Sequence, residues 1–482
     1  MNTWIDPGDL LLMRLDSEFY SPEFVAHERA VVCRKQDGDL LIRSLGDLGK
    51  LVTGPFGSML PSSLFRSQGI PLFRVQNVYP FFPVEANLVF LDPSTSSELS
   101  SSEMKSGTIL ISKAGRVGDA CIVPCNFPLV NITEHVIGLR PSDEIDPYFL
   151  VAALNEQFVN TQLRRFGVGT ILQYLGVVAS RSVQVPVPPM RVQLAIGNKL
   201  RKAEQLRSAS NAARRKTAEL LAKYLPPLPE VSTGNTSWTN NLDLSSRLDA
   251  TFYRLSFLEL ERSLRGRFGS LTSLDRWVAK ARNGHDFREF VGDGTPYLRV
   301  GDIDPYECDP TAAARVSVRR EDLPASERIQ VGDVLLTRKG RFGTALVVDT
   351  VVEESLISSE VIRLQLRSGC DPYVLAAFLN SPHGQMQMER GASGTTMLGL
   401  TREALSAVLV PTFKPDLVAS IRKSEIAAIA GWRASRQLLV SANSDVAALI
   451  SGTLDEQALV VGETTTIEDF TFQSLIRNGV QS

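Results

Sequence analysis

The sequence predicts a mixed α/β (α+β) protein made of two tandem copies of one globular domain, joined by two long helices packed as an antiparallel coiled coil. Two observations carry this prediction. The stretch GTILISKAGRVGDA at 107–120 returns as GDVLLTRKGRFGTA at 332–345, an offset of 225 in the numbering, and each copy ends in a proline cluster followed by a long helical pattern. A repeat of over 200 residues is too long for a solenoid or a propeller, so two separate globular units are expected.

Further matches extend the repeat over most of the chain. The stretch DPYFLVAALN at 146–155 pairs with DPYVLAAFLN at 371–380, again at an offset of 225. Near the start of each copy, RLDSEFY at 14–20 returns as RLDATFY at 247–253, at an offset of 233. Insertions therefore separate the two copies only near their starts.

The elements of one copy follow from local patterns. GTILIS and GDVLLT read as buried strands entered by a turn, and the glycine-rich segment after each reads as a loop, because glycine permits positive φ. Asp146 and Pro147 form a helix N-cap and first helical position, and the apolar residues that follow recur at helical spacing.

The long helices follow the proline clusters, and apolar residues recur every three or four positions over about four heptads in each. The stretch at 226–241 is rich in proline, serine, threonine and asparagine, which is typical of a linker. In chain order the predicted segments are an amino-terminal segment (1–44), the first globular domain (45–188), a central helix (189–225), a linker with the start of the second copy (226–270), the second globular domain (271–413), a carboxy-terminal helix (414–452) and a tail (453–482).

Composition restricts the class of protein. The formal net charge of −2 means that any nucleic-acid surface must be a local basic patch. Five scattered cysteines without framework spacing indicate a reducing, cytoplasmic compartment. No signal peptide is expected at the start, and no uncharged apolar run is long enough to predict a membrane span.

Catalytic constellations are missing from the sequence. It contains no dinucleotide fingerprint, no Walker loop and no Asn-Pro-Pro-aromatic sequence of the amino-methylating methyltransferases. Cys121 and Cys125 with the distant His135 are a weak metal signal, and the second copy lacks both cysteines. We therefore predict no catalytic residue and no metal site on this chain.

The glycine–arginine loop that follows the repeated strand admits two interpretations. It is either a tight turn with solvated cations, or a loop whose backbone amides and cations contact the phosphates of DNA or RNA. Its duplication favours the second, because doubled elements that read two half-sites are common in DNA recognition. The predicted backbone contacts are Lys113 and Arg116 in the first copy and Arg338, Lys339 and Arg341 in the second.

Over nearly its full length the chain resembles the specificity subunit of type I restriction–modification systems. The resemblance lies in the order of the duplicated pieces: the strand and glycine–arginine loop, the Asp-Pro helix, a Gly-x-Thr loop, a Val-Pro cluster and a long helix, all twice. The first copy departs from the usual Gly-Asp before its strand, since Asp333 occurs only in the second.

The resemblance implies a function. Each globular copy would be a target-recognition domain that reads one half of a bipartite double-stranded DNA site. The helices would set the spacing and dock two methyltransferase subunits, which bind S-adenosylmethionine and methylate adenine N6; restriction or translocase subunits are further partners that it allows. No cofactor is expected on this chain. A helix of about 32 residues is roughly 48 Å long, which corresponds to reading heads on the order of 10–14 base pairs apart.

Further candidates for DNA contacts lie in polar loops at matching places of the two copies, and such side chains can read base edges in the major groove. They are Arg74, Gln76, Asn77, Thr170 and Gln173 in the first copy, and Arg282, Asn283, His285, Arg299, Thr395 and Thr396 in the second. For the set around Arg74 and Asn77, a strand end with internally satisfied polar groups is an equal alternative.

Two other functions stay open at this point. A stand-alone, defence-associated DNA-binding protein would use the same two heads with other partners. An enzyme with an active site between its halves would need a catalytic group that recurs in both copies, and the sequence offers none.

Overall fold

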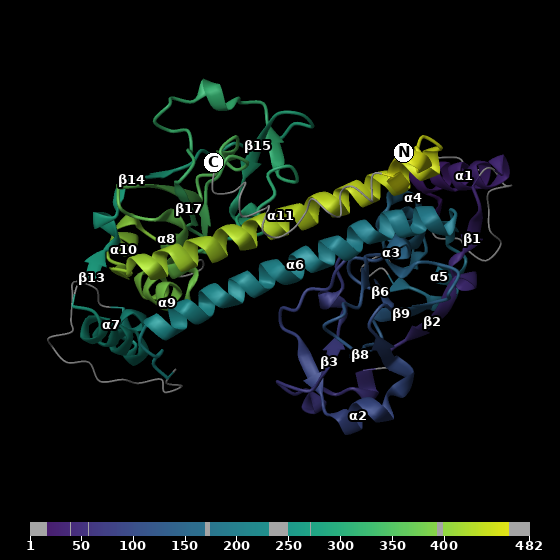
Figure 1. The fold of residues 1–482 in the computed structure, drawn as a ribbon, viewed down its shortest axis with the longest axis horizontal. Helices are drawn as coiled ribbons and strands as arrows, with labels where there is room; N and C mark the ends of the chain where they lie inside the picture. Colours follow the sequence, from purple (N-terminus) through teal and green to yellow (C-terminus); the bar gives the residue numbers. More distant parts are fainter. Residues whose placement is uncertain are drawn as a thin grey trace. The chain divides into compact units, whose positions relative to one another are not determined.

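The computed structural model describes residues 17–38, 40–55, 57–168, 174–230, 249–269, 271–392 and 399–461. The chain divides into two compact units, each of which draws on both halves of the sequence. Unit 1 comprises Met1–Arg207 with Ala434–Thr471, and unit 2 comprises Ser208–Arg433 with Phe472–Ser482. Both are mixed α/β structures, which confirms the predicted fold class (Figure 1).

Unit 1 contains two four-stranded sheets flanked by helices. The first sheet is antiparallel throughout and has the order β2 (Gly49–Thr53), β9 (Val136–Pro141), β6 (Ile109–Ser112), β7 (Ala120–Ile122). The second has the order β4 (Val89–Leu91), β3 (Ile70–Phe73), β8 (Leu129–Ile132), β5 (Glu103–Lys105), in which only β3 and β8 run parallel. The other elements are α1 (Pro22–Asp37), α2 (Pro93–Glu98), α3 (Pro147–Asn155), α4 (Gln157–Arg165), α5 (Val177–Arg181), the pair β1 (Ile42–Ser44) and β12 (Gln184–Pro186), and the pair β10 (Gly167–Val168) and β11 (Tyr174–Leu175).

Unit 2 repeats this plan. Its four-stranded sheet has the order β14 (Val278–Asn283), β20 (Val361–Leu366), β17 (Val334–Thr337), β18 (Ala345–Val347), and its second sheet the order β16 (Ala314–Val316), β15 (Thr295–Leu298), β19 (Leu356–Ile357). The other elements are α7 (Leu255–Arg267), α8 (Pro372–Asn380), α9 (Pro382–Gly391), α10 (Arg402–Ser406) and the pair β13 (Leu271–Ser273) and β21 (Leu409–Pro411). The pairing order of the first sheet is the same in both units, so the sequence repeat is a structural repeat.

The equivalent helices α3 and α8 begin as their sequences predict. Asp146 accepts a hydrogen bond from the backbone N–H of Phe149, and Asp371 does the same for Tyr373 and Val374. Each helix ends in an asparagine that bonds to the last antiparallel strand. In unit 2 the Asn380 amide donates to the carbonyl of Ala345 at 2.8 Å and accepts from its N–H at 2.9 Å. Asn155 makes the same two bonds with Ala120 in unit 1.

The segment before each globular copy is held by an arginine. Arg165 on α4 is 6% exposed; it donates to the carbonyl of Phe19 at 3.0 Å, pairs with Glu28 at 2.5 Å and lies 4.0 Å from the centre of the Phe19 ring. In unit 2, Arg390 makes the corresponding contacts with the Phe252 carbonyl, Glu261 and the Phe252 ring. The phenylalanine of the repeated RLDxxFY motif is thus the surface on which the arginine stacks.

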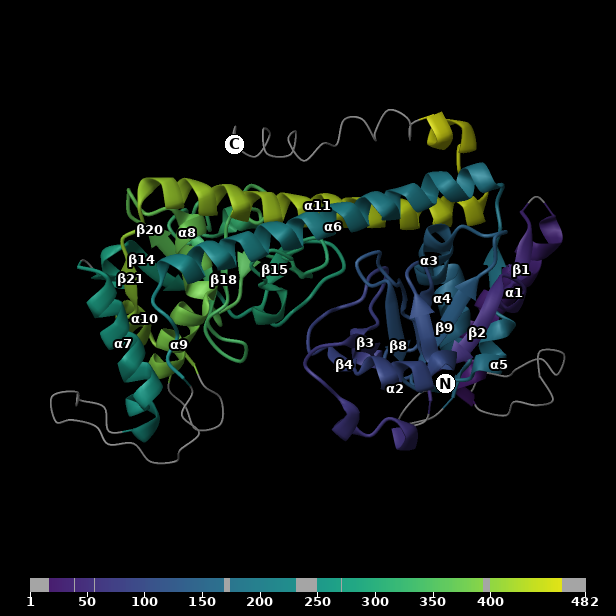
Figure 2. The ribbon, with the colours of Figure 1, turned by 60° about the horizontal axis from the view of Figure 1, so that its bottom comes forward.

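The two long helices are α6 (Met190–Tyr224) and α11 (Pro415–Ser451), and their first residues are separated by the same offset as the repeated motifs. Both views show them side by side (Figure 1 and Figure 2). In unit 1 the Lys199 ammonium pairs with Asp445 at 2.5 Å, and in unit 2 the Ser210 hydroxyl donates to the Ala428 carbonyl at 2.7 Å. An early residue of α6 thus meets a late residue of α11, which confirms the antiparallel pairing.

Small residues form part of the contact between these helices. In unit 2, Ala213 packs with Ala427 and Ala428. Small side chains let helix backbones approach closely, and they carry little of the apolar periodicity expected of a leucine-rich coiled coil. Within the described ranges, no helix is both long enough and apolar enough to cross a membrane.

Candidate nucleic-acid interface

The glycine–arginine loop connects two buried antiparallel strands in each unit, β6 to β7 and β17 to β18. Positive φ is required at equivalent positions, namely at Gly115 (+72°) and Gly118 (+94°) in unit 1 and at Gly340 (+66°) and Gly343 (+82°) in unit 2. The hydroxyl that ends the first strand closes the turn: Ser112 donates to the carbonyl of Arg116, and Thr337 to that of Arg341 at 2.6 Å. The repeated motif therefore encodes a tight turn, whatever its cations bind.

The arginine of this turn reaches the same neighbouring segment in both units. In unit 1 the Arg116 guanidinium lies 3.5 Å from the centre of the Tyr79 ring and pairs with Asp119 at 3.0 Å. In unit 2 Arg341 pairs at 3.3 Å with Asp304, which occupies the position of Tyr79 in the second copy. The two arginine side chains remain 53% and 64% exposed, so each is oriented by the fold and still open to a ligand.

The other cations of the loop, Lys113, Arg338 and Lys339, differ in burial and in the groups that they contact. Lys113 is only 4% exposed; its ammonium donates to the Thr53 hydroxyl at 3.2 Å and lies 4.6 Å from the centre of the Tyr174 ring. A phosphate contact by Lys113 would require the ammonium to leave both partners. Its counterpart Arg338 is half-buried and has no ion-pair partner among the residues that the structure describes. Lys339 pairs with Glu360 at 3.1 Å.

The predicted set at the end of β3 is largely internal. Asn77 is fully buried: it accepts from the N–H of Arg74 at 3.1 Å and donates to the carbonyls of Val84 and Ala86. No polar atom of Asn77 is left for a base, so the interpretation as a satisfied strand end holds for this residue. The Arg74 guanidinium donates to the Asn87 carbonyl at 2.6 Å.

Two of the residues predicted at the ends of β3 and β15, Gln76 and Arg299, are more exposed to solvent. Gln76 is exposed. Arg299, the unit 2 counterpart of Arg74, is 52% exposed and lies 3.6 Å from Asp302.

The polar residues at the end of β14 form one cluster in unit 2. Glu327 lies 3.6 Å from the guanidinium of Arg282 and 3.3 Å from the ring nitrogen of His285. The His285 ring stacks on Phe287, with ring centres 5.7 Å apart. Asn283 is half-buried at the last position of the strand. Glu327, which orients two of the predicted residues, was not predicted, since it lies more than forty positions further along the chain.

The remaining predicted residues, Thr170, Gln173, Thr395 and Thr396, lie outside the described residues.

Most of the candidate cations already have an acidic partner. The pairs are Arg116 with Asp119, Arg282 with Glu327, Arg299 with Asp302, Lys339 with Glu360 and Arg341 with Asp304. These side chains are partly exposed, so each pair is worth little to stability. A DNA phosphate would have to compete with the carboxylate of each pair. The same carboxylates balance the charge of these cations, which is consistent with a net charge of −2 for the whole chain.

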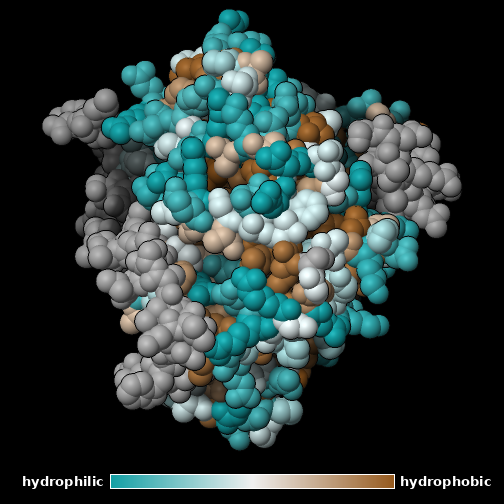
Figure 3. Space-filling model, turned by 90° about the vertical axis from the view of Figure 1, so that its left-hand side faces the viewer, coloured by the Kyte–Doolittle hydropathy of each residue, from teal (hydrophilic) through white to brown (hydrophobic). Residues whose placement is uncertain are grey.

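One face of the molecule can be seen directly. Figure 3 shows the side on which β13 and α10 lie in Figure 1. The surface drawn there is mainly hydrophilic, and its hydrophobic residues form small patches between hydrophilic ones. Such a face suits contact with water and charged groups better than a large apolar interface.

Comparison with protein families and with curated proteins finds no match. Among solved structures, the chain is similar to the type I restriction–modification S subunit from M. genitalium, with 15% identity over 87% of this chain and 96% of that one and a TM-score of 0.43. It is also similar to the HsdS subunit from Thermoanaerobacter tengcongensis, with 15% identity over 86% and 97% and a TM-score of 0.29. A chain from a type I R-M system studied for its complex assembly shows 15% identity over 88% and 97%, and a TM-score of 0.29.

Proposed function

We propose that this chain is the DNA sequence-specificity subunit of a type I restriction–modification complex, and that it performs no chemistry itself. The observation that carries the proposal is the structural repeat, which presents a half-exposed arginine, Arg116 or Arg341, on the same glycine turn of each unit. An oriented guanidinium beside a surface loop suits a phosphate contact, and two such heads suit a site with two halves.

The two units differ where a reader of two different half-sites should differ. Beside the shared turn, unit 1 presents His135 and Tyr174, of which Tyr174 is 40% exposed. Unit 2 presents Asn283 and His285 at the matching end of its sheet. Such groups can donate, accept or stack at the edges of bases.

The long helices would set the distance between the two DNA-reading domains and bind the partner subunits. Helix α6 has 35 residues, which corresponds to about 52 Å. We propose that α6 and α11 set the reading heads on the order of 10–14 base pairs apart and dock two methyltransferase subunits. Those subunits would bind S-adenosylmethionine and methylate adenine N6 in the cytoplasm, with restriction or translocase subunits as further partners. Because most candidate cations are paired with carboxylates, we expect weak DNA binding by this chain alone.

The test is co-expression of the chain with the methyltransferase subunits from the same genome, followed by sequencing of methylated adenines. The expected result is a bipartite motif with a fixed gap. Replacing both Asn283 and His285 with alanine should relax the motif in one half only, while Arg319→Ala, at an exposed arginine elsewhere in unit 2, should leave it unchanged. Methylation that does not depend on this chain would overturn the proposal and favour a stand-alone binder.

A further inference from the structure

The edge strands of the two main sheets differ by one inserted residue. Gly49 of β2 lies opposite Pro141, and Val278 of β14 lies opposite Leu366, which is the position of Pro141 in the second copy. The register of β14 then shifts by one residue between Val278 and Lys280, which indicates a β-bulge. Beyond the bulge, Lys280 therefore takes the place of Lys50, and Ala281 takes the place of Leu51.

The helix beside this edge strand, α5 in unit 1 and α10 in unit 2, also loses an apolar side chain in unit 2. In unit 1, α5 packs against β2, where Leu51 belongs to the hydrophobic core and Val177 packs against that core. The equivalent of Val177 in the second copy is Arg402 at the start of α10. Two apolar side chains of unit 1 are thus replaced in unit 2 by a methyl group and a cation.

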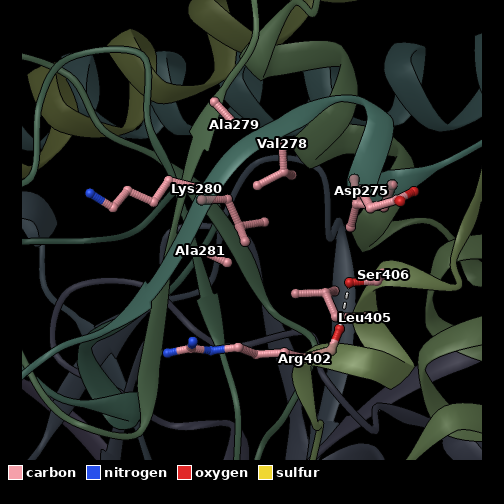
Figure 4. A pocket seen from close by; sticks show the side chains of 10 residues that line it. Asp275, Val278, Ala279, Lys280, Ala281, Arg402, Leu405 and Ser406 are labelled. Atoms are coloured by element: carbon pink, nitrogen blue, oxygen red, sulfur yellow. Dashed lines mark hydrogen bonds between the residues drawn. The ribbon is translucent and has the colours of Figure 1, made fainter.

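A pocket of about 180 Å³ lies between β14 and α10, where these replacements occur. Its apolar lining includes Val278, Ala281, Leu364 and Leu405. Figure 4 shows the side chains of Lys280 and Arg402 extending to one side of this pocket, with Asp275 and Ser406 on the other side.

Lys280 and Arg402 are exposed, and within the described part of the chain neither side chain forms an ion pair or a hydrogen bond. This distinguishes them from the predicted cations Arg282, Lys339 and Arg341, each of which has a carboxylate partner. Two unpaired cations beside an apolar floor suit a ligand that joins an anion to an apolar surface.

We propose that this pocket binds one phosphate group of the DNA backbone, with Lys280 and Arg402 as its cations and the adjoining sugar against the apolar floor. The proposal rests on the proposed function. Its position supports it, because β14 is the edge strand of its sheet and carries both Lys280 and Asn283, about 10 Å apart; a duplex lying along this edge can contact both, although their side chains leave opposite faces of the strand. Leu51 and Val177 fill the equivalent place in unit 1, so only unit 2 would make this contact with the DNA backbone.

The first test measures the salt dependence of duplex DNA binding by the full chain, using fluorescence anisotropy of a labelled oligonucleotide. One lost phosphate contact should reduce the slope of log K against log salt by about 0.9. We expect this reduction for the double variant Lys280→Gln with Arg402→Gln. The matched control, Arg267→Gln with Lys423→Gln, removes two exposed cations elsewhere in unit 2 and should keep the wild-type slope.

A second variant closes the pocket while leaving Lys280 in place. Ala281→Leu with Arg402→Val restores the apolar pair of unit 1, so it should fold with at least wild-type thermal stability and show the same loss of slope. Equal slopes for wild type, both pocket variants and the control would overturn the inference and leave the proposed function standing. A wild-type protein that binds no duplex at any salt concentration would overturn the inference, while the methylation test decides the proposed function.

Inorganic phosphate separates the backbone from a free anion as the ligand. If phosphate raises the melting temperature of the wild-type protein but not of the Lys280→Gln, Arg402→Gln variant, and the DNA slopes are nevertheless equal, the pocket is a site for small anions and the assignment to DNA is wrong. A change of slope together with protection by phosphate would support the backbone assignment.

Discussion

The carboxyl group of Glu425, on α11, allows a quantitative prediction about unit 2. Glu425 is 3% exposed and accepts a hydrogen bond from the Tyr306 hydroxyl at 3.0 Å. Burial raises its pKa from the ordinary 4.5 to about 7, and the nearby Thr217 and Tyr306 hydroxyls and the Arg214 guanidinium oppose this rise only in part. A pKa raised by this much on folding corresponds to about 3 kcal/mol of stability that depends on pH.

The direction follows from proton binding. Below pH 4.5 both the folded and the unfolded protein hold the proton, and this contribution to stability is fully present. Between pH 4.5 and about 7 the unfolded chain releases the proton while the folded chain retains it, so stability falls. Above about pH 7 the folded protein carries a buried charge, and the contribution is lost.

Glu425→Gln keeps an oxygen for the Tyr306 hydroxyl and removes the ionisation. We expect this variant to match the wild type near pH 4.5 and to exceed its free energy of unfolding by about 3 kcal/mol at pH 8. Urea unfolding followed by tryptophan fluorescence measures this, since Trp277 and Trp432 lie in unit 2. The exposed control Glu219→Gln, on α6, should keep the wild-type dependence on pH. A Glu425→Gln protein that is less stable than wild type at pH 8 would refute the reasoning and show that the charge itself is stabilising there.

Two further predictions concern contacts that both units repeat. Arg390→Ala should lower the free energy of unfolding of unit 2 by about 2 kcal/mol, because it removes the hydrogen bonds to the Phe252 carbonyl and to Glu261, which keeps Arg265 as its other partner; Arg390→Lys should recover only part of the loss, and urea unfolding measures both. Asn380→Ala should cost about 2 kcal/mol, since it removes both bonds to the Ala345 backbone, and hydrogen exchange of the Ala345 amide should speed up; unchanged exchange would contradict this role.

The sequence was sufficient for features that depend on local chemistry. The strand before each glycine turn, the Asp146 and Asp371 helix caps and the two long helices are set by neighbours a few positions away, and the structure confirms them. The glycine at 340 shows why such features are readable, because its φ of +66° is a property of the turn itself.

The roles of individual side chains were less predictable, because they depend on residues far apart in the chain. Lys113 was predicted to contact a DNA phosphate, but the hydroxyl of Thr53, sixty positions earlier, holds its ammonium inside unit 1. Glu327 reaches His285 only because the fold brings two loops together. The burial of Asn77 depends on carbonyls that a short polar motif does not reveal.

The internal repeat offers a way to separate structural from functional residues without other sequences. Where the units keep the same contact, as at Arg165 and Arg390, the contact stabilises the common fold. Where equivalent positions of the two units carry residues of different chemical character, the common fold does not require either residue. Leu51 and Ala281 are such a pair, because the core that needs leucine in unit 1 is open to a pocket in unit 2. An open, cationic pocket is costlier to the core than a filled one, so the replacement of leucine by alanine at this position of unit 2 is better explained by a ligand than by folding.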